Sequence, residues 1–140
     1  AAGVMTRNPS AVGQARALQS GDPVRGILRV TRHPVMWGIA LWAAVHLAAR
    51  GDAASLVFFG SFLVLALAGT KLIDARKADA LGEAWGRFAA ATSNVPFTAI
   101  VEGRNRFSAS EIGAKPVLVG LALYGIVVAI HALLFGVRAY

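Results

Sequence analysis

Hydrophobic residues are gathered along the chain into three uncharged runs, at 34–49, 53–70 and 116–137. A helix needs about 20 apolar residues to cross the hydrocarbon layer of a bilayer. The third run meets this length, and the second reaches it if residues 71–73 continue the helix with the Lys71 ammonium turned toward the headgroups. The pattern predicts an all-α, polytopic integral membrane bundle with three transmembrane helices, in which residues 50–52 form a tight turn between antiparallel helices. A buried bundle of soluble helices is the alternative.

Composition supports the membrane interpretation. The 140 residues leave room for one domain, 1–140, and 56% of them are hydrophobic whereas 15% are charged. An ordinary soluble domain carries about 25% charged residues. The chain contains no cysteine, which excludes disulfides, thiolate catalysis and cysteine-based zinc or iron–sulfur sites.

The basic residues predict the orientation in the membrane. Twelve of the 14 lysines and arginines precede the first run or lie between the second and third, and only Arg50 and Arg138 flank the opposite ends. We expect the protein in the bacterial inner membrane. By the positive-inside rule, residues 1–33 and 71–115 are then cytoplasmic and the C-terminus lies outside the cytoplasm. The net charge of +7 therefore indicates cytoplasmic loops and contact with anionic lipid rather than nucleic acid.

An apolar stripe runs through the segment between the second and third runs. Leu81, Trp85, Phe88 and Ala89 follow the spacing of one helical face. This predicts an amphipathic helix at the cytoplasmic interface, with Leu81, Trp85 and Phe88 turned toward lipid or the bundle and Arg87 toward water.

Polar residues and small residues predict the remaining local structure. Residues 92–96 (TSNVP) end the amphipathic helix, and Ser108 and Glu111 have the spacing of a capping box that opens a short lead into the third spanning helix, with Pro116 in its first turn. Small residues recur in all three runs, which favours close helix contact. They are Gly38, Ala44, Gly60, Ala66, Gly69, Gly120, Gly125 and Ala129.

Two histidines lie inside the apolar runs, where an ionisable group is costly and usually functional. His46 is twelve residues after Pro34 and His131 is fifteen after Pro116, about 18 Å and about 22 Å along helices that run in the same direction. Both are therefore predicted at similar depth in the outer half of the membrane, where neutral imidazole can ligate haem iron. Zinc is disfavoured, because no cysteine or carboxylate accompanies them. The alternative is that each histidine hydrogen-bonds a neighbouring helix.

Arg32 and His33 form a second candidate site at the start of the first run. The N-terminus of a helix presents unpaired N–H groups, and two basic side chains beside it favour a carboxylate, phosphate or propionate. The alternative is a positively charged anchor in front of a helix that begins at Pro34.

Tryptophans offer flat surfaces on which a ligand can stack. Trp42 precedes His46 by one helical turn, and Trp37 and Trp85 lie elsewhere in the chain. The alternative for all three is the structural role of tryptophan near membrane interfaces.

Several motifs in a fixed order resemble the NnrU family. The motifs are Thr31-Arg32-His33-Pro34, Trp42-x-x-x-His46, Gly51-Asp52, Thr92-Ser93-x-x-Pro96-Phe97, Glu102-Gly103-Arg104, and Gly120-Leu121-Ala122-Leu123-Tyr124 with His131 and Gly136-Val137. The resemblance covers the chain from about Arg7 onward. It implies a single NnrU-like membrane domain with further helices upstream, which agrees with an N-terminus that begins Ala1-Ala2-Gly3.

The same pattern resembles the 15-cis-zeta-carotene isomerases, plant relatives of NnrU. These are integral membrane haem b enzymes that isomerise a central cis double bond of a carotene. Their haem-ligating histidine ends a Trp-Cys-x-x-His run, so the resemblance implies His46 as the catalytic haem ligand and an apolar polyene as substrate. Ala43 stands where that run has cysteine, which excludes a thiolate ligand or redox ligand switch there. The family's other histidine lies upstream.

Within the chain, these arguments give one set of expected haem contacts. Depth makes His131 the best candidate in this chain to face His46 across the iron. The anion-binding argument places Arg32 and His33 at an anionic group of the cofactor, either a haem propionate or a cofactor carboxylate, and Trp42 lies beside His46.

Two other functions remain open. The chain is distantly similar to isoprenylcysteine carboxyl methyltransferases, which carry Arg-His-Pro at a helix start and a nearby glycine, here Gly38, and bind S-adenosylmethionine on the cytoplasmic side. Glu83, Trp85 and Pro96 resemble their downstream pattern loosely. The third function is a non-enzymatic subunit of a membrane complex linked to nitrogen-oxide metabolism, or of a homo-oligomer.

Overall fold

The computed structural model describes residues 1–19 and 21–136, and all regular structure in that part of the chain is helical. The long helices are α2 (Pro34–Ala49), α3 (Ala53–Ala91) and α6 (Ala114–Phe135). The short ones are α1 (Ala2–Met5), the 3-10 helices η1 (Ala15–Gln19) and η2 (Gly26–Arg29), α4 (Thr98–Val101) and α5 (Ala109–Ile112). The all-α class is therefore confirmed. Arg138 lies outside the described residues.

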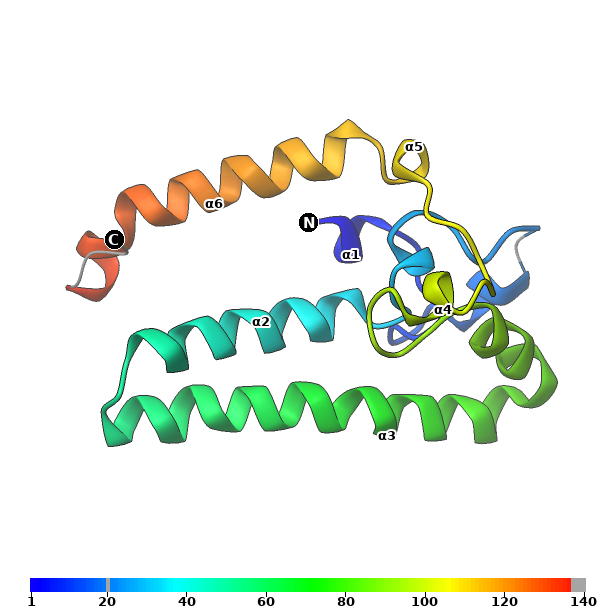
Figure 1. Ribbon diagram of the computed structural model, residues 1–140, viewed down its shortest axis with the longest axis horizontal. Coiled ribbons are helices and arrows are strands. Elements are labelled where there is room, and N and C mark those ends of the chain that lie inside the picture. The colour runs from blue at the N-terminus through cyan, green and yellow to red at the C-terminus, as the bar shows by residue number, and fades with distance from the viewer. Residues whose placement is uncertain (20, 137–140) are drawn as a thin grey trace.

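Helices α2 and α3 form a tightly packed antiparallel pair (Figure 1). The turn between them ends at Asp52, whose Oδ1 accepts a hydrogen bond from the Ser55 backbone N–H at 2.9 Å and so caps α3. Small side chains fill the contact between the helices, since Ala43 and Ala66 are buried. The predicted turn and close approach of these two helices are confirmed.

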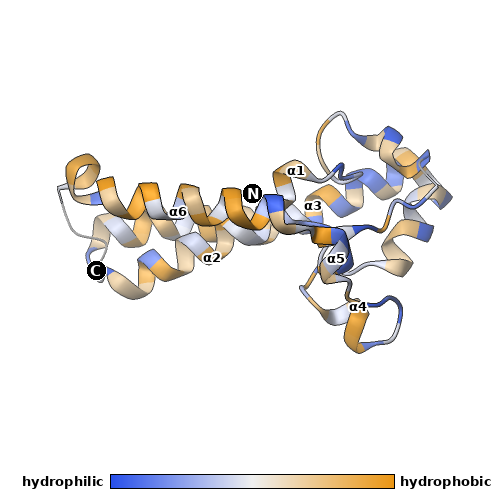
Figure 2. Ribbon diagram, turned by 90° about the horizontal axis from the view of Figure 1, so that it is seen from above, coloured by the Kyte–Doolittle hydropathy of each residue, from blue (hydrophilic) through white to orange (hydrophobic). Residues whose placement is uncertain are grey.

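Two helices, not three, are long and apolar enough among the described residues to cross a membrane, and these are α3 and α6. Helix α2 has 16 residues and is about 24 Å long, short of the roughly 30 Å hydrocarbon layer. The expectation of three spans is therefore not confirmed. Helix α6 has no buried residue and packs mainly against α1. Most of its residues are hydrophobic (Figure 2), and many of their side chains are exposed.

The predicted amphipathic helix is the last part of α3, beyond a bend at Gly82. The Gly82 backbone has φ 51° and ψ −128°, a conformation that only glycine adopts readily. Beyond the bend, Trp85 and Phe88 are buried against Leu28 of η2. The stripe thus faces a small protein core rather than lipid, and Arg87 is exposed as predicted.

The segment before α6 contains the short helix α5, as predicted, but its capping box is not formed. The Ser108 side chain makes no cap hydrogen bond. The Glu111 carboxylate, which a capping box needs, instead binds Arg29 of η2. Pro116 lies in the first turn of α6, where its missing N–H has no helical acceptor to lose.

Candidate functional site

A cluster of charged side chains lies where the apolar part of the α2–α3 pair ends. Arg32 and His33 directly precede α2, and Asp74 lies four residues after the uncharged run of α3. The Arg32 Nε donates to both carboxylate oxygens of Asp74 at 2.9 and 3.1 Å, and the His33 Nε2 lies 2.7 Å from Asp74 Oδ1. The His33 side chain is 1% exposed, that of Arg32 13% and that of Asp74 20%. Asp74 is therefore a largely buried counter-ion for two basic groups.

Asn94 ties the loop after α3 to this cluster. Its Nδ2 donates to Asp74 Oδ2 at 3.2 Å. Its backbone carbonyl accepts hydrogen bonds from Trp37 Nε1 at 2.8 Å and from the Thr31 hydroxyl at 2.6 Å. The Trp37 indole thus serves a structural hydrogen bond that holds the loop beside the first turn of α2.

The structure brings an anion to Arg32 and His33, and this anion is the protein's own Asp74. Beside the cluster lies an open pocket of about 520 Å³ that is lined in part by Arg32, Ser93, Thr98 and Arg104. Binding of an external carboxylate, phosphate or propionate by Arg32 and His33 stays a prediction.

A second ion pair fastens the segment before α6 to η2. The Arg29 guanidinium donates from Nε to Glu111 Oε2 and from Nη2 to Glu111 Oε1, both at 2.9 Å. The Gly26 backbone N–H also donates to Glu111 Oε2 at 2.9 Å. The hydrogen bonds from Arg29 and then from Gly26 lower the pKa of Glu111 to about 2. Such a bidentate pair fixes orientation as well as charge.

This pair predicts a specific acid sensitivity. A carboxyl with a lower pKa in the folded state stabilises the fold above its unfolded pKa, and the contribution is lost as the pH falls through the folded pKa. For Glu111 this window runs from about 4.5 down to about 2. We expect the protein to be more stable than the Glu111→Gln variant above the window and the two to converge at its lower end. Thermal unfolding of both proteins in detergent at a series of pH values checks this. A stability difference that stays constant across the pH range contradicts it.

His46 lies in the last turn of α2, within an aromatic cluster. Its Nδ1 is 2.8 Å from the Trp42 backbone carbonyl. Because a carbonyl can only accept, Nδ1 carries a proton, and in the neutral imidazole Nε2 then has the lone pair. The imidazole stacks on Phe59 of α3 at a centroid distance of 4.7 Å and lies 5.1 Å from the Trp42 ring. This is the tautomer and the kind of backbone support that axial haem histidines have.

An apolar pocket leads along α2 to the same aromatic cluster. It has a volume of about 260 Å³ and lies between α1 and the first half of α2. Gly38 and Ile39 line it, and Trp42 closes it toward His46. A Cβ added at Gly38 meets no atom within 4 Å, so the glycine leaves open space rather than serving a close helix contact.

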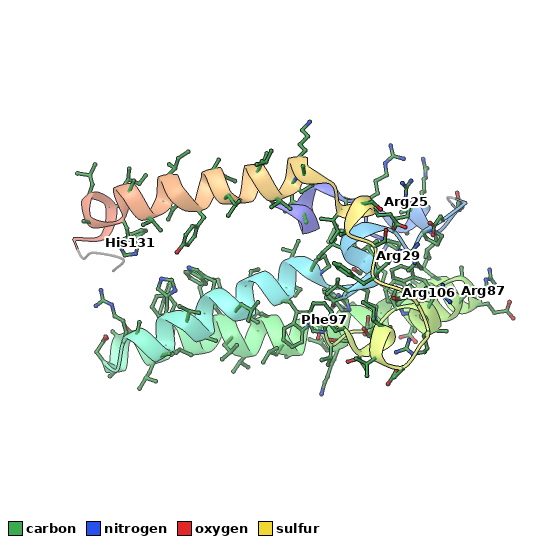
Figure 3. The ribbon with its side chains drawn as sticks, turned by 45° about the horizontal axis from the view of Figure 1, so that its top comes forward. Arg25, Arg29, Arg87, Phe97, Arg106 and His131 are labelled. Carbon is green, nitrogen blue, oxygen red and sulfur yellow. The ribbon has the colours of Figure 1, made fainter. Side chains whose placement is uncertain are left out.

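His131 lies near the carboxyl end of α6, and its ring is 4.8 Å from that of Phe135. Helices α2 and α6 both begin at the polar end of the molecule and extend away from it, and Figure 3 shows His131 near the far end of α6. Among the described residues, no group of three or more His, Cys, Asp or Glu side chains is placed to hold a metal ion. A haem needs only axial imidazoles from the protein. The shared role of His46 and His131 stays a prediction.

Sequence reasoning missed Asp74 and Asn94 as members of the charged cluster. In the sequence, Asp74 stands beside Arg76 and Lys77 after the second apolar run, a pattern that favours a solvated charged face. A single carboxylate one turn beyond an uncharged run, with Arg32 and His33 expected at the same membrane boundary, is the signal that points to it. Asn94 gave no local signal, because its partners lie 20 or more residues away.

Comparison with known proteins places the chain. It is 33% identical over 81 residues to the chloroplastic 15-cis-zeta-carotene isomerase of Zea mays, which covers 58% of this chain and 22% of that protein. It is 35% identical over 79 residues to the enzyme of the same name from Arabidopsis thaliana, covering 56% and 22%. The matched region is thus less than a quarter of these relatives' length, and no solved structure matches the chain. The model of the family described as NnrU protein matches residues 1–139. Since that match covers almost the whole sequence, the chain belongs to the NnrU family.

Proposed function

We propose that this chain is the haem-binding part of a membrane protein that isomerises a cis double bond in an apolar, carotenoid-like polyene. The observation that carries the proposal is His46, whose Nδ1–H is held by the Trp42 carbonyl so that Nε2 presents a lone pair from an apolar helix. The names of the plant relatives support the reaction and the substrate class.

The residues around His46 suit an apolar substrate. Trp42 and Phe59 fix the plane of the imidazole through ring contacts. The apolar pocket along α2 ends at Trp42 and offers a polyene a path from the lipid toward His46. A haem held by His46 would supply iron chemistry that can polarise the double bond of the polyene. The chain's own contribution is to hold the ligand nitrogen, exclude water and position the double bond.

An absorption spectrum of the detergent-purified full-length protein tests the proposal. We expect a Soret band, and conversion of a cis-polyene to its trans isomer when the substrate is supplied in micelles and followed by chromatography. A Soret band without conversion separates haem binding from the isomerase. A spectrum without a Soret band, with bound S-adenosylmethionine, contradicts the proposal in favour of the methyltransferase.

We also propose that the polar end of the molecule, including residues 71–115, faces the cytoplasm of a bacterial cell. The twelve cations at this end and the position of Arg50 at the opposite end of α2 support this orientation. We expect a cysteine at position 52 to react with an impermeant maleimide on intact cells and a cysteine at position 104 to react only after lysis. The reverse pattern contradicts the orientation.

A further inference from the structure

Several of the exposed apolar side chains at the polar end of the molecule lie in one loop region. The loop after α3 and the short helix α4 carry Val95 and Phe97, each 54% exposed, and Val101, 84% exposed. Trp85 and Phe88 at the same end are buried in the internal core, whereas Val12 and Phe107 are exposed outside this loop. An exposed apolar cluster rimmed by polar residues marks an interaction surface.

The backbone conformation of Phe97 indicates that its exposed ring is not incidental. Phe97 has φ 67°, and it is the one non-glycine residue with positive φ among residues 1–19 and 21–136. Glycine or asparagine adopts this conformation at lower cost than a phenylalanine does. The conformation is held because the Phe97 N–H donates to the Val30 carbonyl at 2.8 Å and the Phe97 carbonyl accepts from the N–H groups of Ile100 and Val101. The fold thus keeps a bulky apolar side chain at a position that disfavours it and turns it outward.

This loop is fastened at the level where the apolar helices begin. Asn94 is bonded to Trp37 in the first turn of α2 and to Asp74 just beyond the uncharged run of α3. Figure 3 shows Phe97 on the side of the polar end that adjoins the apolar helices, whereas Arg25, Arg106 and Arg87 lie farther from them. The apolar ring therefore lies toward the bilayer and the cations lie behind it, which is the polarity of a segment that lies in a membrane surface.

We infer that the loop around Val95 and Phe97 inserts into the headgroup–acyl boundary of an anionic bilayer and holds the polar end of the molecule against the membrane. The arginines behind the ring, among them Arg25 and Arg106, give this end of the molecule a positive charge that attracts an anionic lipid surface. The loop is continuous with the membrane boundary of α2 and α3, so the bilayer that receives these helices is also within its reach. The inference is independent of haem and of the isomerase reaction.

Site-directed spin labelling tests this inference, because the chain has no native cysteine to replace. Phe97→Cys and Val95→Cys are labelled in the full-length protein, reconstituted in vesicles of equal parts phosphatidylglycerol and phosphatidylcholine. Position 95 serves as a second probe because it lacks the positive φ of residue 97. Arg87→Cys is the aqueous control, since the Arg87 side chain is 76% exposed. Collision of each label with oxygen and with a water-soluble nickel complex gives its depth.

We expect the labels at 95 and 97 to collide with oxygen and be shielded from nickel, at about 5–10 Å below the phosphate level, while the label at 87 meets nickel freely. Two results overturn the inference. Nickel access at 95 and 97 equal to that at 87 places the loop in water. Immobile labels that meet neither reagent place it under another protein segment. A haem-free or inactive preparation does not alter the readout, so failure of the proposed function is distinguishable.

Discussion

Asp74→Asn is expected to lower the free energy of unfolding by about 3 kcal/mol. The substitution keeps the size of the side chain but removes the negative charge that faces Arg32 and His33. Removing one member of a buried ion pair costs about 3–5 kcal/mol, because the remaining charge stays desolvated without a partner. We take the lower end of this range, because the Arg32 and Asp74 side chains are still 13% and 20% exposed and water reaches part of the cluster. Thermal or denaturant unfolding in detergent micelles measures the loss.

Asp79→Asn is the matched control, because Asp79 lies on the same helix and is exposed. It is expected to change stability by no more than a few tenths of a kcal/mol. Arg32→Gln and Asp74→Asn combined are expected to cost less than the sum of the two single changes, since they act on one pair. Equal losses for Asp74→Asn and Asp79→Asn contradict the assignment of Asp74 as the buried counter-ion. Normal membrane insertion of Arg32→Gln with reduced cofactor content would in addition support anion binding at this site.

His46→Gly is expected to abolish the Soret band of the full-length protein. The substitution removes the imidazole whose Nε2 lone pair is free to ligate iron. Loss of a metal ligand weakens binding at least as much as the about 10–100-fold decrease that follows when only a ligand's hydrogen-bond partner is removed. The haem content per protein, from the pyridine haemochrome spectrum, measures the effect. Added imidazole is expected to restore part of the band by entering the space that the side chain vacates.

His131→Ala decides where the second axial ligand lies. Loss of haem in both variants assigns the pair to His46 and His131. Loss in His46→Gly alone places the second ligand upstream of this chain, as the family resemblance implies. A normal spectrum in both variants contradicts the haem site proposed around these residues. Circular dichroism and elution volume in detergent confirm that each variant is folded.

The boundaries of the apolar helices were predictable because their signals are local. Pro34 begins α2 and Asp52 caps α3, and both lie next to the apolar runs that they delimit. These local signals did not determine the number of membrane spans. The first apolar run has the composition of a spanning helix, but at 16 residues it is too short to be counted as one. The fate of the amphipathic stripe was likewise hidden. Its partner, Leu28, is 57 residues before Trp85 in the sequence, and nothing in the periodicity distinguishes a protein core from lipid.

The candidate site was predictable in part for the same reason. His46 and Arg32 can be identified from the sequence because they are polar residues in or beside uncharged runs. The sequence does not identify the groups to which they are hydrogen-bonded. The tautomer of His46 depends on the Trp42 carbonyl, which any residue at position 42 supplies. The partner of Arg32 is 42 residues away on another helix. Three-dimensional proximity of this kind leaves no spacing pattern in one sequence.

The bend at Gly82 constrains the number of residues between Asp74 and the core residues Trp85 and Phe88. Gly82 is eight residues after Asp74 and three residues before Trp85. One inserted or deleted residue between Asp74 and the bend turns everything beyond by about 100° about the α3 axis. Trp85 and Phe88 then leave Leu28, while Asp74 keeps its contacts with Arg32 and His33. Homologous chains are therefore expected to show no length variation from 74 to 82, because one added or lost residue breaks the alignment between the Asp74 contacts and the Trp85–Phe88 core.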